Sequence, residues 1–312
     1  MTEPDVPGVV VRQDARGCLV RIDDGRELFC SVRGKVRLLG STHSTTTLAV
    51  GDRVVCRAQR DGRGSIEAVR PRTSVLCRPD PHRVRLQHVL AANVDRIVVV
   101  ASAAEPEFTP GFIDRVLAYA EWARLEALIV VNKMDLASSP PPEVETYRRL
   151  GYRVLLTSAT TGAGIDELRA ALVGKASVVT GHSGVGKSSL LNALAPGLGL
   201  SVGQVNEFSG RGRQTTTAAT WTPIPGGGAI VDTPGVREFG LFNVPPREIT
   251  RLFRDLAEVA ARCKYGDCLH AGEPGCGLDA AIEAGTVAPW RVDSYRRVLA
   301  TLSDVKPWEL GT

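Results

Sequence analysis

A glycine-rich motif, Gly181-His-Ser-Gly-Val-Gly-Lys-Ser188, constrains the fold of this chain more than any other feature. An apolar run at 178–179 precedes it and a helical pattern at 189–194 follows it, and in this strand–loop–helix context the motif forms a phosphate-binding loop. Backbone N–H groups and the N-terminus of the helix attract phosphate oxygens there. We expect Lys187 to reach the β- and γ-phosphates and to act in catalysis, and Ser188 to ligate Mg²⁺. The loop residues predicted to contact the nucleotide are Gly181, His182, Ser183, Gly184, Val185, Gly186, Lys187, Ser188 and Ser189.

Strand-like and helix-like segments alternate around this motif. Strands are predicted at 97–100, 128–131, 154–156 and 178–179, and helices at 112–122, 143–150 and 165–172. Such alternation is typical of a parallel β-sheet covered by helices on both faces, and ligands of these sheets bind where the strands end. The sequence therefore predicts a central α/β domain whose ligand lies at the carboxyl edge of the sheet.

Two short motifs at such strand ends, residues 132–135 and 157–159, indicate which base is bound. The carboxylate of Asp135 can accept two hydrogen bonds from guanine, Lys133 can cover the base, and a backbone N–H at 158–159 can donate to the O6 oxygen. Adenine presents the wrong donors, which disfavours an ATPase. The alternative to base binding for the first motif is an ordinary turn with a helix cap. The residues predicted to bind the guanine nucleotide here are Asn132, Lys133, Met134, Asp135, Ser158 and Ala159.

Two further segments have the composition of loops that sense the γ-phosphate. Asp232-Thr-Pro-Gly235 follows an apolar run and supplies a carboxylate near Mg²⁺ and, at Gly235, a backbone N–H for the γ-phosphate. The polar, glycine-rich stretch 206–217 ends in three threonines. We expect Thr216 to act in catalysis and Thr217 to ligate Mg²⁺, although the choice between the threonines stays open.

The third region of interest is a cluster of potential metal ligands, Cys263-x4-Cys268-x-His270-x5-Cys276. Three thiolates and one imidazole complete a closed tetrahedral site, as in structural zinc sites, and nearby glycines and a proline permit the tight turns that ligation needs. The alternative is three reduced cysteines and a surface histidine. The other four of the seven cysteines are scattered through apolar stretches, where we expect small buried side chains.

Five short β-type runs occupy residues 9–70, as in a small closed barrel such as the OB-fold, which binds nucleic acids. Residues 1–90 contain 16 Lys and Arg against 10 Asp and Glu, although the whole chain has a net charge of only +4. This asymmetry favours a polyanionic partner such as RNA. A solvated basic face on a structural barrel is the alternative, because few aromatic residues are present for base stacking.

A chain of 312 residues, 43% of them hydrophobic, can bury the cores of more than one domain. We expect an RNA-binding OB-fold barrel at 1–72, a linker at 73–90, a GTPase domain at 91–240 and a zinc-binding helical domain at 241–312. No apolar run is long enough to cross a membrane, and the first residues do not resemble a secretory signal. We therefore expect a cytoplasmic monomer without a membrane partner.

Taken together, the motifs resemble the RsgA (YjeQ) family, which comprises circularly permuted GTPases dependent on the small ribosomal subunit. The resemblance covers nearly the whole chain and is carried by residues 132–135, 181–189, 212–217, 232–235 and 273–277. It implies an N-terminal OB-fold, a central P-loop GTPase domain with permuted motif order and a C-terminal, mainly helical zinc domain. It also implies that the protein binds the small subunit and its rRNA late in maturation and hydrolyses GTP to GDP and phosphate when stimulated by the subunit.

Two positions bear on the rate of hydrolysis. Val236 occupies the place where Ras-like GTPases carry a water-orienting glutamine. In the resembled family a histidine before the threonine triplet is the suspected substitute, but this chain has Gln214 there. We keep Gln214 as the candidate for orienting water and expect slow turnover without a partner. The alternative function is a nucleotide-gated RNA-binding module with little or no turnover.

Overall fold

The first five strands close into a barrel in this computed structural model. The structure describes residues 5–14, 17–32, 48–79, 87–195, 219–232, 241 and 244–303. Around the barrel the strand order is β1–β2–β3–β5–β4 and back to β1, with β3 and β5 parallel and the other pairs antiparallel. This order and the Greek-key path fit the expected OB-fold. The strands are β1 (Asp5–Asp14), β2 (Gly17–Ile22), β3 (Glu27–Val32), β4 (Arg53–Ala58) and β5 (Arg63–Val69).

Alternation of side chains explains why these short strands form a barrel. In β2 and β4 every second side chain is buried, so one face of each strand supplies the interior and the other faces solvent. The interior is apolar and includes Val10, Val20, Cys30, Cys56 and Ile66. The cysteines of the barrel are thus small buried side chains, as expected from their scattered positions.

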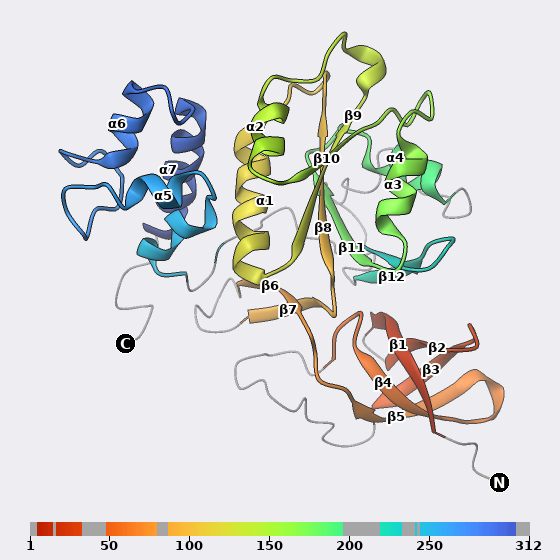
Figure 1. Ribbon diagram of the computed structural model, residues 1–312. Helices are drawn as coiled ribbons and strands as arrows, with labels where there is room; N and C mark the ends of the chain where they lie inside the picture. Colours follow the sequence, from red (N-terminus) through yellow and green to blue (C-terminus); the bar gives the residue numbers. More distant parts are fainter. Residues whose placement is uncertain are drawn as a thin grey trace, which may run out of the picture.

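The central sheet lies above the barrel in Figure 1 and carries the predicted alternation of strands and helices. Five of its strands are parallel in the order β10–β9–β8–β11–β13, and β12 adds an antiparallel edge. All seven residues of the central strand β8 are buried because helices cover both faces. The strands are β8 (Arg96–Ser102), β9 (Glu126–Asn132), β10 (Arg153–Leu156), β11 (Ala176–Gly181), β12 (Thr220–Pro223) and β13 (Ala229–Asp232).

Helices on the two faces of this sheet belong to two separate apolar clusters. Helices α1 (Pro110–Ala123) and α2 (Glu143–Arg149) share one cluster with the C-terminal helices. Helices α3 (Ile165–Leu172) and α4 (Lys187–Leu194) form the other cluster on the opposite face (Figure 1). Each of these four helices was predicted to within two residues at either end, and α4 begins inside the glycine-rich motif.

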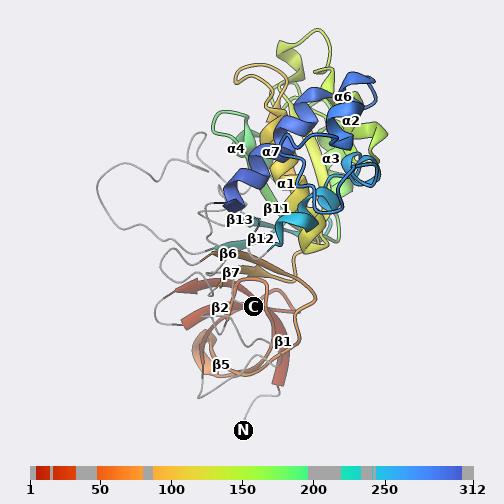
Figure 2. The ribbon, with the colours of Figure 1, turned by 90° about the vertical axis from the view of Figure 1, so that its left-hand side faces the viewer.

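Barrel and central sheet are continuous through one strand pair, in which Arg12 of β1 lies opposite Thr220 of β12. A hairpin of β6 (Val75–Pro79) and β7 (Gln87–Ala92) lies between them (Figure 2), so the stretch 73–90, for which prolines predict a linker, contains β-structure. A buried clasp closes the junction. Asn93 donates to the Gly51 carbonyl at 2.8 Å, and the guanidinium of Arg72 binds the buried carboxylate of Asp52 at 2.7 and 2.8 Å.

The C-terminal region is helical, as expected, and its first helical stretch is divided. A 3₁₀ helix, η4 (Pro246–Leu252), and the short α5 (Leu256–Ala260) flank Phe253, whose backbone is extended. The Phe253 ring is buried edge-on against Tyr295 with centroids 5.6 Å apart, and this contact explains the break. The chain continues into α6 (Gly277–Glu283) and α7 (Pro289–Ser303). None of the helices in the described ranges is both long and apolar enough to span a membrane.

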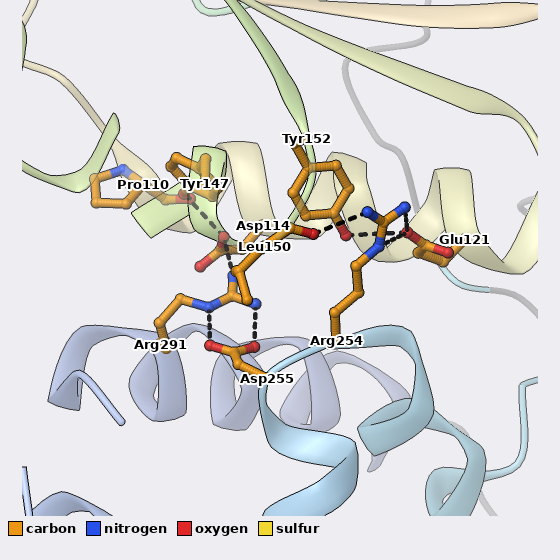
Figure 3. A network of polar contacts seen from close by, with 9 residues as sticks. All are labelled: Pro110, Asp114, Glu121, Tyr147, Leu150, Tyr152, Arg254, Asp255 and Arg291. Carbon is orange, nitrogen blue, oxygen red and sulfur yellow. Dashed lines mark hydrogen bonds and ion pairs between the residues drawn. The ribbon is translucent and has the colours of Figure 1, made fainter. Parts of the chain in front are cut away.

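A buried polar network joins the C-terminal helices to α1 (Figure 3). Arg291 of α7 binds Asp255 through two hydrogen bonds of 2.8 and 2.6 Å and also pairs with Asp114 of α1. The side chains of Arg291 and Asp114 are 2% and 0% exposed, so the Asp114 charge depends on Arg291 for compensation. Burial raises the pKa of Asp114 to about 6, although the positive charge of Arg291 opposes that shift.

The pKa of Asp114 predicts how stability changes with pH. Because the pKa in the folded protein exceeds the ordinary value of about 3.9, the folded protein binds a proton here more tightly than the unfolded chain. The stability gained from this tighter proton binding is fully present below about pH 4 and is lost as the pH rises through about 6. The free energy of unfolding of the wild type, minus that of Asp114→Asn, should therefore rise by about 1 kcal/mol from pH 7 to pH 5. Urea denaturation at each pH measures this difference.

Asp166→Asn is the control, because it removes an exposed carboxylate from α3 without touching the network. The difference in free energy of unfolding between the wild type and Asp166→Asn should change less between pH 7 and pH 5. A wild-type minus Asp114→Asn difference that stays constant between pH 7 and pH 5 would contradict the prediction.

Candidate functional site

The glycine-rich loop between β11 and α4 has a backbone that larger side chains would disrupt. A Cβ atom on Gly181 would lie 2.3 Å from the Val100 carbonyl oxygen. Gly186 has φ +91°, and its Cβ would lie 2.4 Å from the Asn132 side-chain nitrogen. Glycine at these two positions therefore lets the loop pack closely against β8 and β9 just before α4 begins.

Lys187 and Ser188 follow directly at the first turn of α4. The Lys187 Nζ donates to the carbonyl oxygens of Gly181 and His182 at 2.9 and 2.7 Å, so the ammonium group lies over the loop. Asp232 ends the neighbouring parallel strand β13. Burial raises the pKa of Asp232, and the positive charge of Lys187 opposes the shift. A cation, a hydroxyl and a carboxylate thus gather at one edge of the sheet, where oxygen donors suit Mg²⁺.

Asn132, the last residue of β9, ties three loops together. Its Nδ2 donates to the Val185 carbonyl oxygen at 2.9 Å, and its Oδ1 accepts from the Thr157 hydroxyl at 3.3 Å and from the Ala159 N–H at 3.2 Å. The side chain therefore joins the glycine-rich loop to both motifs predicted to contact the base. We expected Asn132 near the nucleotide, but this connecting role was not predicted.

The two base motifs also contact each other directly. The Ser158 hydroxyl donates to Asp135 Oδ1, and the Met134 N–H donates to the Thr157 carbonyl at 3.1 Å. The Ser158 N–H donates within its own loop, to the Ala163 carbonyl oxygen at 2.9 Å. Both backbone donors considered at 158–159 thus have partners within the protein, since the Ala159 N–H donates to Asn132 Oδ1.

The start of α1 forms a further side of the loop that sequence patterns did not reveal. The Phe112 ring lies against the His182 ring with centroids 4.3 Å apart, and the Lys133 Nζ donates to the Glu105 carbonyl oxygen just before α1. Burial and the charges of Arg115 and Lys187 lower the pKa of His182, which favours a neutral imidazole. Phe112 was predicted only as a helical residue, because an apolar side chain in a helix gives no signal of such a contact.

Several predicted residues cannot be placed. Gln214, Thr216, Thr217 and Gly235 lie outside the residues that the structure describes.

The Cys and His residues at 263–276 do come together. Their ligand atoms all lie within 4.8 Å of one another, and His270 Nδ1 lies 3.3, 3.5 and 3.6 Å from the sulfur atoms of Cys263, Cys268 and Cys276. A tetrahedron with Zn–S of about 2.3 Å and Zn–N of about 2.0 Å separates sulfur from nitrogen by about 3.5 Å. The cluster thus fits a zinc ion. Burial lowers the pKa of His270, and a neutral imidazole is the form that ligates metals.

Hydrogen bonds outside the cluster hold the ligand loop in shape. The Glu273 carboxylate accepts from the N–H groups of Leu269 and Ala271 at 2.8 and 2.7 Å, and the Gly277 N–H donates to the Cys263 sulfur at 3.1 Å. Arg296 of α7 donates to the His270 carbonyl oxygen at 2.9 Å. Such outer contacts orient metal ligands, so the loop and α7 form one unit.

Comparison with known proteins identifies the same architecture elsewhere. The RsgA GTPase family model matches residues 69–242, more than half of the chain. A protein of Dickeya dadantii named small ribosomal subunit biogenesis GTPase RsgA is 42% identical over 98% of this chain and 87% of its own length. One with the same name from Bacteroides fragilis is 36% identical over 94% of this chain and 96% of its own length.

Solved structures agree with this assignment. The crystal structure of YjeQ from Thermotoga maritima, 34% identical, superimposes with a TM-score of 0.75 over 97% of this chain and all of its own. YloQ, described as a circularly permuted GTPase, is 27% identical with a TM-score of 0.68 over 97% of both chains. Since the family model spans more than half of the chain and these relatives match nearly all of it, the chain belongs to the RsgA family of circularly permuted GTPases.

Proposed function

We propose that this GTPase binds the small ribosomal subunit and assists its late maturation, hydrolysing GTP to GDP and phosphate with stimulation by the subunit. One observation carries the proposal: relatives named for small ribosomal subunit biogenesis align with nearly the whole chain, including the barrel and the C-terminal region. We further propose that the protein acts as a cytoplasmic monomer.

Recognition of guanine is assigned to the base motifs. In this proposal the Asp135 carboxylate accepts hydrogen bonds from guanine, Lys133 covers the base and a backbone N–H at 158–159 donates to O6. The hydrogen bonds of Asn132 support this assignment, because they hold both base motifs at a fixed distance from the phosphate-binding loop. Met134 and Ser158 complete this side of the site.

Phosphate binding and hydrolysis are assigned to the loops at 181–189 and 232–235. Backbone N–H groups of the first loop and of Gly235 bind phosphate oxygens, and the Lys187 ammonium offsets charge that develops on the transferred group. Ser188, Asp232 and Thr217 would hold Mg²⁺, which neutralises phosphate charge when bound. We assign orientation of the attacking water to Gln214 and a supporting role to Thr216.

Contact with rRNA is assigned to the barrel. The excess of basic residues in the first 90 residues supports the barrel's part. Some of these cations already have partners: Arg57 pairs with Asp5 at 3.0 Å, and Arg72 belongs to the clasp with Asp52. Three further basic residues, Arg33, Lys35 and Arg37, lie outside the described residues, and we assign them no contact with rRNA.

Turnover of GTP, titrated with purified small subunits at two salt concentrations, tests the proposed function. We expect slow hydrolysis alone and a rise of at least tenfold with subunits, since partners that complete such sites add about 10³- to 10⁵-fold in related systems. Affinity for the subunit should fall steeply with salt because phosphate contacts release counterions. Large subunits are the control. Subunit binding without any stimulated phosphate release would instead support the nucleotide-gated RNA-binding module.

Replacing Asp135 by Asn tests the base assignment. Losing a charged acceptor for two donors should weaken GTP binding by at least about tenfold. Xanthosine triphosphate carries an oxygen where guanine has the 2-amino group, so the Asn amide can donate to it and the variant should prefer this nucleotide. Competition with a fluorescent GDP analogue measures both affinities. Unchanged discrimination between the two nucleotides would refute the role of Asp135, and Asp166→Asn serves as the exposed-carboxylate control.

Elemental analysis tests the proposed single structural zinc. We expect about one zinc per chain in the native protein and less than half in Cys276→Ser, because three ligands bind zinc far more weakly than four. Hydrogen exchange should then speed up across residues 263–277. Cys77→Ala, which lies outside the cluster, should keep its zinc. Native protein without zinc would contradict the proposal.

A further inference from the structure

The first turn of α1 contacts the phosphate-binding loop and the C-terminal helices at the same time. On one side the Phe112 ring lies 4.3 Å from the His182 ring. On another side Asp114, two residues later, pairs with Arg291 of α7 (Figure 3). Gly111 lies so close to α7 that a Cβ atom there would approach Arg297 to 3.3 Å. The two contacts therefore act on the same turn of helix.

This turn is held by buried polar contacts. The Tyr147 hydroxyl of α2 lies 2.8 Å from Asp114 Oδ1 and 3.2 Å from the Pro110 carbonyl oxygen, and Tyr147 has no exposed surface. The Arg291 guanidinium is in turn fixed by the two hydrogen bonds to Asp255. A displacement of Arg291 must therefore either move the start of α1 or leave the buried Asp114 charge uncompensated.

The segment leading into α1 extends the contact to the rest of the site. The Glu105 carbonyl oxygen accepts from the Lys133 Nζ, and Pro106 lies 3.6 Å from the position of a Cβ atom on Gly184. Residues 105–112 thus touch the base motif and the phosphate-binding loop in succession. Residues 105–112 therefore line one side of the site, and the position of this segment depends on the C-terminal helices.

We propose that Phe112 and Arg291 are positioning residues of the guanine nucleotide site. Arg291 holds the first turn of α1, and Phe112, carried on that turn, keeps His182 and the phosphate-binding loop in the shape that binds nucleotide. The inference rests on the proposed nucleotide site. By linkage, bound nucleotide strengthens the docking of the C-terminal helices on α1 to the same extent. This contact between α7 and the first turn of α1 is separate from the covalent connection, in which the chain itself leads from 232–235 to the zinc ligands.

A second contact between the same two parts of the protein provides a matched control. At the other end of α1, Arg254 binds Glu121 at 2.7 Å, donates to the Leu150 carbonyl oxygen at 2.9 Å and lies over the Tyr152 ring at 4.1 Å. This contact also docks the C-terminal helices but lies at the opposite end of α1 from the turn that touches the nucleotide loops. A general loosening of the docking would affect both ends, whereas the proposed path involves only the Arg291 end.

The test is a double-mutant cycle with Phe112→Leu, Arg291→Gln and the combined variant, with Arg254→Gln as the control. The dissociation rate of a fluorescent GDP analogue, and kcat and KM for GTP, are measured for each. We expect each single variant to raise the dissociation rate and KM by about 3- to 10-fold with kcat changed less than twofold. In the combined variant the dissociation rate and KM should rise by about as much as in the single variant with the larger effect, because both changes interrupt one path. Arg254→Gln should change each quantity less than twofold.

Two results would overturn the inference: effects of Phe112→Leu and Arg291→Gln that multiply, or an Arg254→Gln variant that matches Arg291→Gln. If Arg291→Gln does not fold, as judged by circular dichroism and zinc content, Asp114→Asn takes its place in the cycle because it weakens the same pair with little change in shape. Wild-type protein that binds no guanine nucleotide would refute the proposed function, whereas normal wild-type binding with multiplying effects would refute this inference alone.

Discussion

The buried amide of Asn132 is the interaction on which the nucleotide site depends. Its side chain uses one donor and one acceptor to join three loops that follow three different strands, β9, β10 and β11. An unpaired amide at this depth would be costly, so each partner loop is fixed by the requirement that the amide be satisfied. Gly186 is the counterpart of this constraint, because only a residue without a Cβ atom can approach Asn132 so closely. The separation between the two motifs at 132–135 and 157–159 and the glycine-rich loop is thereby set by contacts within the protein.

Permutation of the motifs changes what surrounds this core. Since the base motifs precede the phosphate-binding loop, the chain leaves the nucleotide site through β12 and β13 and continues into the C-terminal helices. Those helices then return to pack on α1, whose first turn touches the same loop. The C-terminal region is therefore connected to the site twice, once along the chain and once through space. The zinc-ligand loop belongs to the connection through space, because α7 carries both Arg291 and Arg296, and Arg296 donates to the His270 carbonyl oxygen.

Much of this could be predicted from sequence because it depends on local patterns. The five barrel strands, helix α3 and the Cys3His cluster were predicted within a few residues, since alternation, helical periodicity and ligand spacing are written into short segments. The pair between Asp114 and Arg291 could not be predicted, because isolated charged residues 177 positions apart resemble ordinary surface residues. The division of the helix at Phe253 and the hairpin β6–β7 likewise depend on partners distant in sequence.

The pairing of β1 with β12 makes one strand a member of two structures at once. β1 closes the barrel with β2 and β4, and beyond a bulge between Val10 and Arg12 it pairs through Arg12 with Thr220, at the start of the edge strand β12 of the central sheet. A chain shortened to begin after the barrel would lose the partner of Thr220, and unpaired groups at a sheet edge can pair with strands of other molecules. The barrel thus guards one end of that edge strand, and losing it would alter the exposed edge of the GTPase sheet whatever the barrel itself binds.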